Sequence, residues 1–173
     1  LSVIDDGKTT ILNINDCPYQ LAKNTIEKRV LKDFEKIDLL LTGYGGAGPY
    51  PQCLDNLDLD QKIISGNKKK INFLNQSLDF IKLTKPDYYM PFAGTYVLSG
   101  KLNSLQNLRG VPLIDEVYDY LDLKIDKLEI SKKVEGLKLN YDCTYDFDNK
   151  KFSKNYEKIN IDNFNEYQKS YLS

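Results

Sequence analysis

Short apolar runs that alternate with helix-type patterns constrain the fold of this 173-residue chain more than any other feature. Strands are predicted at 9–14, 37–41 and 87–92, and helices after Pro18, at about 68–83 and at 113–121. The turn sequence Asp-Asp-Gly-Lys at 5–8 predicts a hairpin at the start of the chain. The run at 37–41 is short and continuous, which is typical of a buried parallel strand. This alternation predicts a layered α/β fold with right-handed crossovers.

The regular pattern weakens after residue 125. Segments 128–130 and 137–141 alternate like strands, and 161–172 favours a helix, but Asp, Asn, Lys and Tyr dominate. We therefore expect a main domain at 1–125 and a polar appendage at 126–173. Because the chain opens with Leu1 inside the predicted hairpin, we also expect a further segment upstream.

Composition excludes several classes of partner. Hydrophobic residues make up 41% and charged residues 28%, as in globular domains, and the net charge of −1 provides no basic field for nucleic acid. No apolar run approaches the roughly 18 residues of a membrane span, and no secretory signal is visible. Three scattered cysteines (Cys17, Cys53 and Cys143), without a Cys-x-x-Cys pair, fit a reducing cytoplasm, where we expect the protein.

The chain contains no histidine. This excludes Ser-His-Asp and Cys-His catalysis within the chain, and it removes the commonest transition-metal ligand. A metal bound by this chain alone would depend on carboxylates, thiolates and carbonyl oxygens. Catalysis by carboxylate pairs, lysine or tyrosine stays open.

Three segments follow directly after predicted strands: Asn-Asp-Cys at 15–17, the glycine-rich loop at 43–51, and Pro-Phe-Ala-Gly at 91–94. If the strands are parallel, these segments share the carboxyl edge of the sheet, where α/β proteins bind ligands. Asp16 is the best single candidate, either as a hard oxygen ligand for a metal or as the N-cap of the next helix.

The glycine-rich loop matches neither the P-loop nor the dinucleotide-binding spacing. Its backbone amides can approach a phosphate or a sugar, or the loop is a tight turn packed under its neighbour. Tyr44 and Tyr50 either stack on a ligand or serve as packing residues. Lys101 and Arg109 form either an anion clamp or, as the favoured interpretation, part of a solvated face. Nothing in the tyrosine content indicates a nucleic-acid platform.

The sequence resembles the second half of metallo-β-lactamase-fold proteins. The resemblance is carried by Thr-Ile-Leu-Asn-Ile-Asn-Asp-Cys at 10–17, by Asp-Leu-Leu-Leu-Thr-Gly-Tyr-Gly-Gly-Ala-Gly-Pro-Tyr-Pro at 38–51 and by Pro-Phe-Ala-Gly at 91–94. It covers about residues 1–125. The branch it is most similar to includes nucleotide-sugar hydroxylases and hydrolase-like proteins from polysaccharide loci.

This resemblance implies the C-terminal half of a four-layer αββα sandwich whose first half carries the histidine-rich motif. Asp16 matches the metal-ligand aspartate of the second half, and Gly45, Gly46, Tyr50 and Gly94 would lie at the substrate. No histidine stands in the region 90–94, where the family often has its last ligand. The implied cofactor is a divalent metal, zinc or iron, in a mononuclear or altered site of the intact protein, or none in this chain alone.

Three functions follow as alternatives. In the first, the chain is part of a metal-dependent hydrolase or hydroxylase that acts on a small or nucleotide-sugar substrate. In the second, the chain is a non-catalytic binding or scaffold module that has lost the metal site. The third is an unrelated flavodoxin-like module, because alternating strands and helices occur in many folds. A half-sandwich exposes an apolar sheet face, so we expect the chain to pair with a histidine-bearing N-terminal half or to self-associate.

Overall fold

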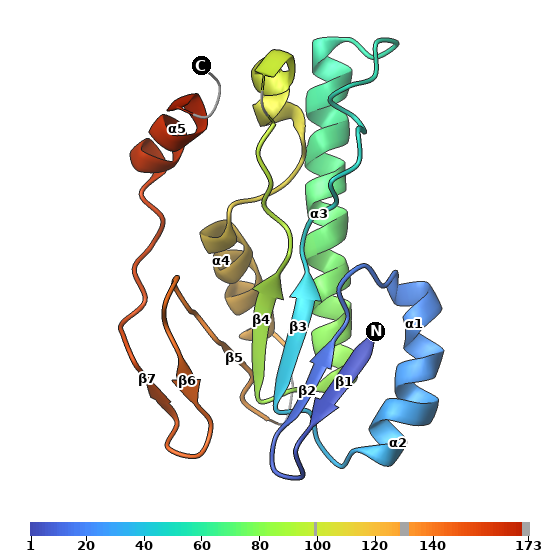
Figure 1. Cartoon of the computed structure of the whole chain (residues 1–173). Helices are drawn as coiled ribbons and strands as arrows, with labels where there is room; N and C mark the ends of the chain where they lie inside the picture. Colours follow the sequence, from blue (N-terminus) through green and yellow to red (C-terminus); the bar gives the residue numbers. More distant parts are fainter. Residues whose placement is uncertain (99, 129–131, 171–173) are drawn as a thin grey trace.

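One five-stranded sheet runs through the molecule, with the strand order β1-β2-β3-β4-β5 (Figure 1). The computed structural model describes residues 1–98, 100–128 and 132–170. The strands are β1 (Ser2–Asp5), β2 (Thr10–Asn13), β3 (Leu39–Gly43), β4 (Tyr88–Phe92) and β5 (Glu135–Gly136). β1 is antiparallel to β2, and all other neighbours are parallel. The predicted α/β class is confirmed, with a mostly parallel sheet.

The β1–β2 hairpin forms at the predicted turn. Asp6 Oδ1 accepts hydrogen bonds from the backbone N–H groups of Lys8 and Thr9, at 2.9 and 2.8 Å. These bonds favour the charged carboxylate and lower the pKa of Asp6. Gly7 takes a φ of 84°, a conformation that few other residues adopt without strain.

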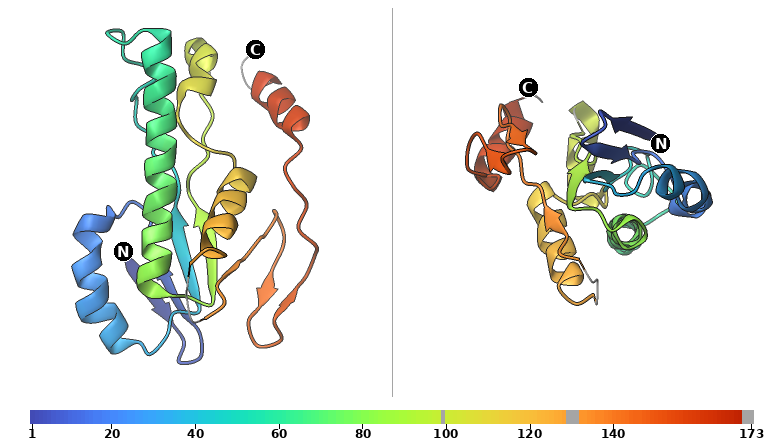
Figure 2. Two further views of the ribbon diagram at one scale, coloured as in Figure 1. Left: turned by 180° about the vertical axis from the view of Figure 1, so that it is seen from behind. Right: turned by 90° about the horizontal axis from the view of Figure 1, so that it is seen from below.

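The helices that join the parallel strands lie on one face of the sheet (Figure 2). The first crossover is α1 (Tyr19–Thr25), a π-helix, η1 (Ile26–Val30), and α2 (Leu31–Asp33); the later ones are α3 (Leu59–Thr84) and α4 (Ile114–Ile125). The cross-strand neighbours Leu12, Leu40 and Tyr89 point toward these helices and form the centre of the core. No described helix is long and apolar enough to cross a membrane.

Helix α3 begins nine residues before the predicted start at Lys68. Asp58 caps it: its side chain accepts from the N–H of Gln61, and the Gln61 side chain accepts from the N–H of Asp58. The apolar stripe that suggested Lys68 marks only the part of α3 that packs on the sheet, and the helix continues well beyond the strand ends (Figure 1). The helix ends at Thr84, close to the predicted stop before Pro86.

The segment after residue 125 contributes to the main sheet. β5 pairs with β4, and Val134 and Leu137 are buried beside it, so the sheet extends into the segment that we expected to be a polar appendage. The strand predicted at 137–141 is wrong, because regular pairing ends at Gly136. Of the strand predicted at 128–130, residues 129 and 130 lie outside the described residues.

The rest of the tail forms small elements beside the sheet (Figure 1). These are a hairpin of β6 (Tyr145–Asp146) and β7 (Lys151–Phe152), followed by α5 (Ile161–Ser170), which confirms the predicted helix over its described part. A 3₁₀ helix, η2 (Gly100–Leu108), precedes α4 and was not predicted as a helix.

The face of the sheet opposite the helices is apolar. We call it the open face and define it by the side chains of Ile4, Ile11, Leu39, Leu41 and Met90, which alternate along the strands with the core residues. In the described part of the chain no helix covers the open face (Figure 2). Ile4 is 59% exposed at its edge, Ile11, Leu41 and Met90 are partly exposed, and Leu39 is buried. The β6–β7 hairpin lies on this side, where it packs on β4 through aromatic contacts with Tyr88.

Candidate functional site

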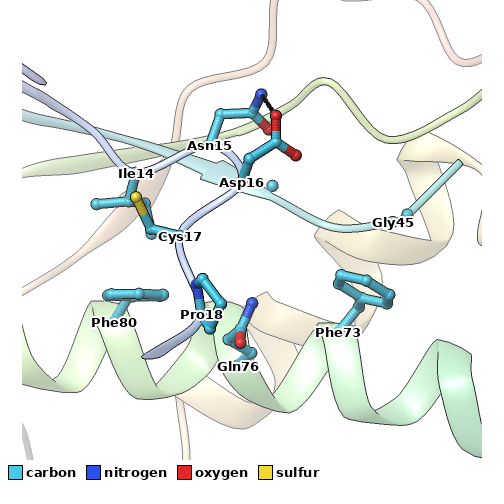
Figure 3. A pocket seen from close by; sticks show the side chains of 11 residues that line it. Ile14, Asn15, Asp16, Cys17, Pro18, Gly45, Phe73, Gln76 and Phe80 are labelled. Carbon is cyan, nitrogen blue, oxygen red and sulfur yellow. Dashed lines mark hydrogen bonds between the residues drawn. The ribbon is translucent and has the colours of Figure 1, made fainter. Parts of the chain in front are cut away.

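The three strand-end segments predicted from the sequence do share one edge of the sheet. β2, β3 and β4 are adjacent and parallel, so the segments that follow them leave the sheet side by side. A cavity of about 320 Å³ opens there, between the loops after β2 and β3 and the middle of α3 (Figure 3). Its lining includes Asp16, Cys17, Gly45, Gly46, Phe73 and Gln76. This size lies at the lower end of the range for small-molecule sites.

Asp16 lies at the mouth of this cavity, exposed to solvent, in a left-handed conformation with a φ of 58°. Aspartate is among the few residues that tolerate this conformation. Its Oδ2 accepts a hydrogen bond from Asn15 Nδ2 at 3.1 Å. Asp16 does not cap the next helix, because α1 begins after Pro18 without a side-chain cap. The carboxylate therefore remains available to a ligand in the cavity.

Gly45 and Gly46 line the cavity, and each is a glycine because of a close neighbour. A Cβ on Gly45 would lie 2.9 Å from the carbonyl oxygen of Gly94, and one on Gly46 would lie 2.9 Å from the Phe73 ring. A Cβ on Gly94 would lie 2.4 Å from the Tyr44 ring. The loops after β3 and β4 are thus packed together, and Gly94 supports the cavity wall from behind.

Tyr44 fixes the same two loops to each other. Its hydroxyl shares a 2.8 Å hydrogen bond with Thr95 Oγ1 and accepts a second from the Thr95 N–H. The ring is buried, so Tyr44 is a packing residue. Tyr50 lies elsewhere: it is exposed, precedes a cis Pro51, and its carbonyl oxygen accepts from Lys69 Nζ. Of the predicted residues, Asp16, Gly45 and Gly46 line the cavity, whereas Tyr50 and Gly94 do not.

Helix α3 supplies a wall that the sequence analysis missed. Figure 3 shows Asn15 and Asp16 on one side of the cavity and Phe73 and Gln76 on the other. Gln76 Oε1 accepts from the N–H of Tyr19, and Ser77 Oγ donates to the carbonyl oxygen of Gly43. The sequence signal for these contacts was the pair of polar residues, Gln76 and Ser77, next to the apolar stripe of the helix.

The residues at the cavity supply one carboxylate toward a metal, with the Cys17 thiol next to it in sequence. Among the described residues, no three His, Cys, Asp or Glu side chains come together as a metal site. Asp16 is therefore the one carboxylate in the lining of this cavity, and the described residues around it form no complete set of metal ligands. Comparison of the chain with family models, with curated proteins and with solved structures finds no match.

Lys101 and Arg109 differ strongly in environment. Lys101 is exposed on η2, whereas Arg109 is only 6% exposed. The expectation of a solvated face is therefore wrong for Arg109. The cause is a tight backbone contact: a Cβ on Gly110 would lie 2.2 Å from the carbonyl oxygen of Gly66 in α3, which holds the segment after η2 against that helix.

Proposed function

We propose that this chain is the second half of a metallo-β-lactamase-like αββα sandwich and supplies Asp16 to the metal site of a hydrolase or hydroxylase. The observation that carries the proposal is the open face. Parallel sheets are ordinarily covered on both faces, whereas the helices here lie on one. In the proposed assembly, the sheet of a histidine-bearing half packs on the open face and completes the four layers.

The position of Asp16 supports the same function. In a shared metal site, the second half contributes an oxygen ligand at a strand end, and Asp16 follows β2 with its carboxylate exposed at the cavity mouth. A bound zinc or iron would supply a polarised substrate or an activated oxygen ligand. This chain would hold one side of that metal through Asp16 Oδ1 or Oδ2, while Asn15 orients the carboxylate.

The cavity fits a small or nucleotide-sugar substrate as its proposed occupant. Gly45 and Gly46 bring backbone close to the cavity, and Phe73 offers an apolar surface for a ring. Gln76 adds an amide on the same wall. Gly94 acts indirectly, since it allows Tyr44 to lock the loops together. Tyr50 takes part only if the loop that carries it closes over the ligand.

A non-catalytic α/β binding module is the second candidate. It is favoured by the small number of possible metal ligands. The chain has no histidine, and among the described residues no three His, Cys, Asp or Glu side chains come together. In that case the open face would still bind a partner, but Asp16 would hold no metal.

Metal analysis separates the two candidates. The protein is isolated from its own cells with whatever segment or polypeptide covers the open face, and its zinc and iron are measured for wild type and Asp16→Ala. We expect most of the metal to be lost in the variant, because one charged ligand is removed. Asp55→Ala, which removes an exposed carboxylate from the loop after β3, should keep its metal. Unchanged metal content in Asp16→Ala would reject the ligand role.

A further inference from the structure

A second cavity, of about 400 Å³, lies between α3, the segment that joins η2 to α4, and α5. It shares no lining residue with the cavity at Asp16. Its polar lining comes from Asn67 and Lys70 on α3, Gln106 and Asn107 on η2 with Arg109 just after it, Glu116 at the start of α4, and Asn165 on α5. Four separate parts of the chain thus place polar side chains around one space.

Arg109 is held firmly at this cavity. Its Nε donates to the carbonyl oxygen of Gln106 at 2.6 Å, and its guanidinium lies over the Tyr96 ring, 5.2 Å from the centroid. Gln106 is also buried, and its Oε1 accepts from the N–H of Leu98 at 2.6 Å. With the amide oxygen engaged there, the amide nitrogen of Gln106 is left for another acceptor.

The charge of Arg109 has no counter-ion in the part of the chain that the structure describes. No described carboxylate forms an ion pair with it, and both Arg109 Nη1 and Gln106 Nε2 are buried without a hydrogen-bond acceptor. Glu116 lines the cavity, but its oxygens accept from Lys70 Nζ and from the N–H of Leu113. The face of the Tyr96 ring offers no acceptor to the guanidinium N–H groups, and the Tyr96 hydroxyl, which is also buried without a partner, forms no hydrogen bond with them.

The pKa values of Arg109 and of nearby Lys69 reflect this burial. Burial lowers the pKa of Arg109, and burial together with the nearby Arg109 charge lowers the pKa of Lys69. Proteins rarely bury a guanidinium without a partner, because desolvation of an unpaired charge is costly. Because Arg109 Nη1 and Gln106 Nε2 are themselves buried, an anion in the cavity would supply the missing acceptors after these two side chains turn toward it. The planar fork of arginine suits two oxygens of one phosphate or carboxylate.

We propose that this second cavity binds a small organic anion, with a phosphate or carboxylate head on Arg109 and Gln106 and a hydroxyl-rich body among the asparagine amides. The cavity is larger than a bare inorganic anion requires, and Asn67 and Asn165 offer donors and acceptors to hydroxyl groups. This inference does not depend on a metal at Asp16, and a failure of either leaves the other standing.

The test is an NMR titration of the whole chain with glucose 6-phosphate, glucuronate and neutral glucose. We expect saturable shifts of the Gln106 side-chain amide and the Gly110 backbone amide with at least one of the two anions, and none with glucose. The relative affinity of the two anions identifies the head group. Arg109→Gln should weaken binding about tenfold or more, because the charged hydrogen bonds are lost. Lys101→Gln, which removes an exposed charge from η2, should bind as wild type does.

A second variant keeps the test decisive if Arg109→Gln does not fold. Gln106→Glu places a carboxylate beside the guanidinium, so it should raise the melting temperature and abolish anion binding. The proposal is overturned if neither anion gives saturable shifts, if Arg109→Gln or Gln106→Glu binds as tightly as wild type, or if Lys101→Gln loses as much affinity as Arg109→Gln.

Discussion

Tyr89 lies at the centre of the core, fully buried on β4 beside its cross-strand neighbour Leu40. Its hydroxyl donates to Asp122 Oδ1 on α4 at 2.5 Å, which joins the sheet to a helix through a charged acceptor. Burial is the main cause that raises its pKa, and the bond to Asp122 is the next. The phenol is therefore held in its neutral form.

Replacement of this hydroxyl should destabilise the fold. Tyr89→Phe removes one hydrogen bond to a carboxylate that is 41% exposed and can return to water, so the free energy of unfolding should fall by about 1–2 kcal/mol. Urea unfolding followed by circular dichroism measures this change. Tyr141→Phe is the matched control, because Tyr141 is 99% exposed, and it should leave stability unchanged.

The stability difference between wild type and Tyr89→Phe should also depend on pH. The folded protein holds the Tyr89 proton more tightly than the unfolded chain does, so this contribution is complete below the ordinary pKa of 10.0 and is lost as the pH rises above it. The stability difference between wild type and Tyr89→Phe should therefore shrink above pH 10.0. A difference that grows with pH would contradict the assigned direction.

The position of a single residue could be predicted from the sequence only where that residue directly follows a predicted strand. Asp16 could be placed at the sheet edge because it follows an apolar run, but its left-handed conformation could not be predicted. The burial of Arg109 depends on the contact of Gly66 with Gly110, which are 44 positions apart and lie on different elements. No local pattern encodes that contact.

At the scale of elements, apolar periodicity and capping signals predict different parts of α3. The apolar stripe gave the part of the helix that packs on the sheet, whereas the true start follows Asp58 and Gln61. The Asp-x-x-Gln spacing was present in the sequence and is a known helix-start signal. β5 could not be predicted, because two residues of a short edge strand carry no periodicity.

The cap should contribute measurably to α3. Asp58→Ala removes the side-chain acceptor for the Gln61 N–H, and caps of this kind contribute about 0.5–2 kcal/mol. Thermal unfolding should show a lower midpoint, with faster amide exchange in the first turns of the helix. Asp55→Ala removes a nearby exposed carboxylate that caps no helix, and an equal loss in that variant would argue against the capping role.

At the scale of the whole molecule, the arrangement of layers matters most. The sequence predicted the parallel sheet and the shared strand-end edge, and both are confirmed. The placement of all crossover helices on one face is visible only in the structure (Figure 2). It leaves the open face, from Ile4 to Met90, as an apolar surface on which Ile4 is exposed and Ile11, Leu41 and Met90 are partly exposed, and contact of these side chains with water is unfavourable.

Sedimentation velocity tests the claim of a half-sandwich most directly. The isolated chain should sediment as a dimer or larger species, and addition of a histidine-bearing half should convert it to a one-to-one complex. Met90→Lys, which places a charge on the open face, should weaken both associations, whereas Ile64→Lys, at an exposed position on α3, should weaken neither. A clean monomer of the wild-type chain, with no partner and no dependence on concentration, would contradict the account.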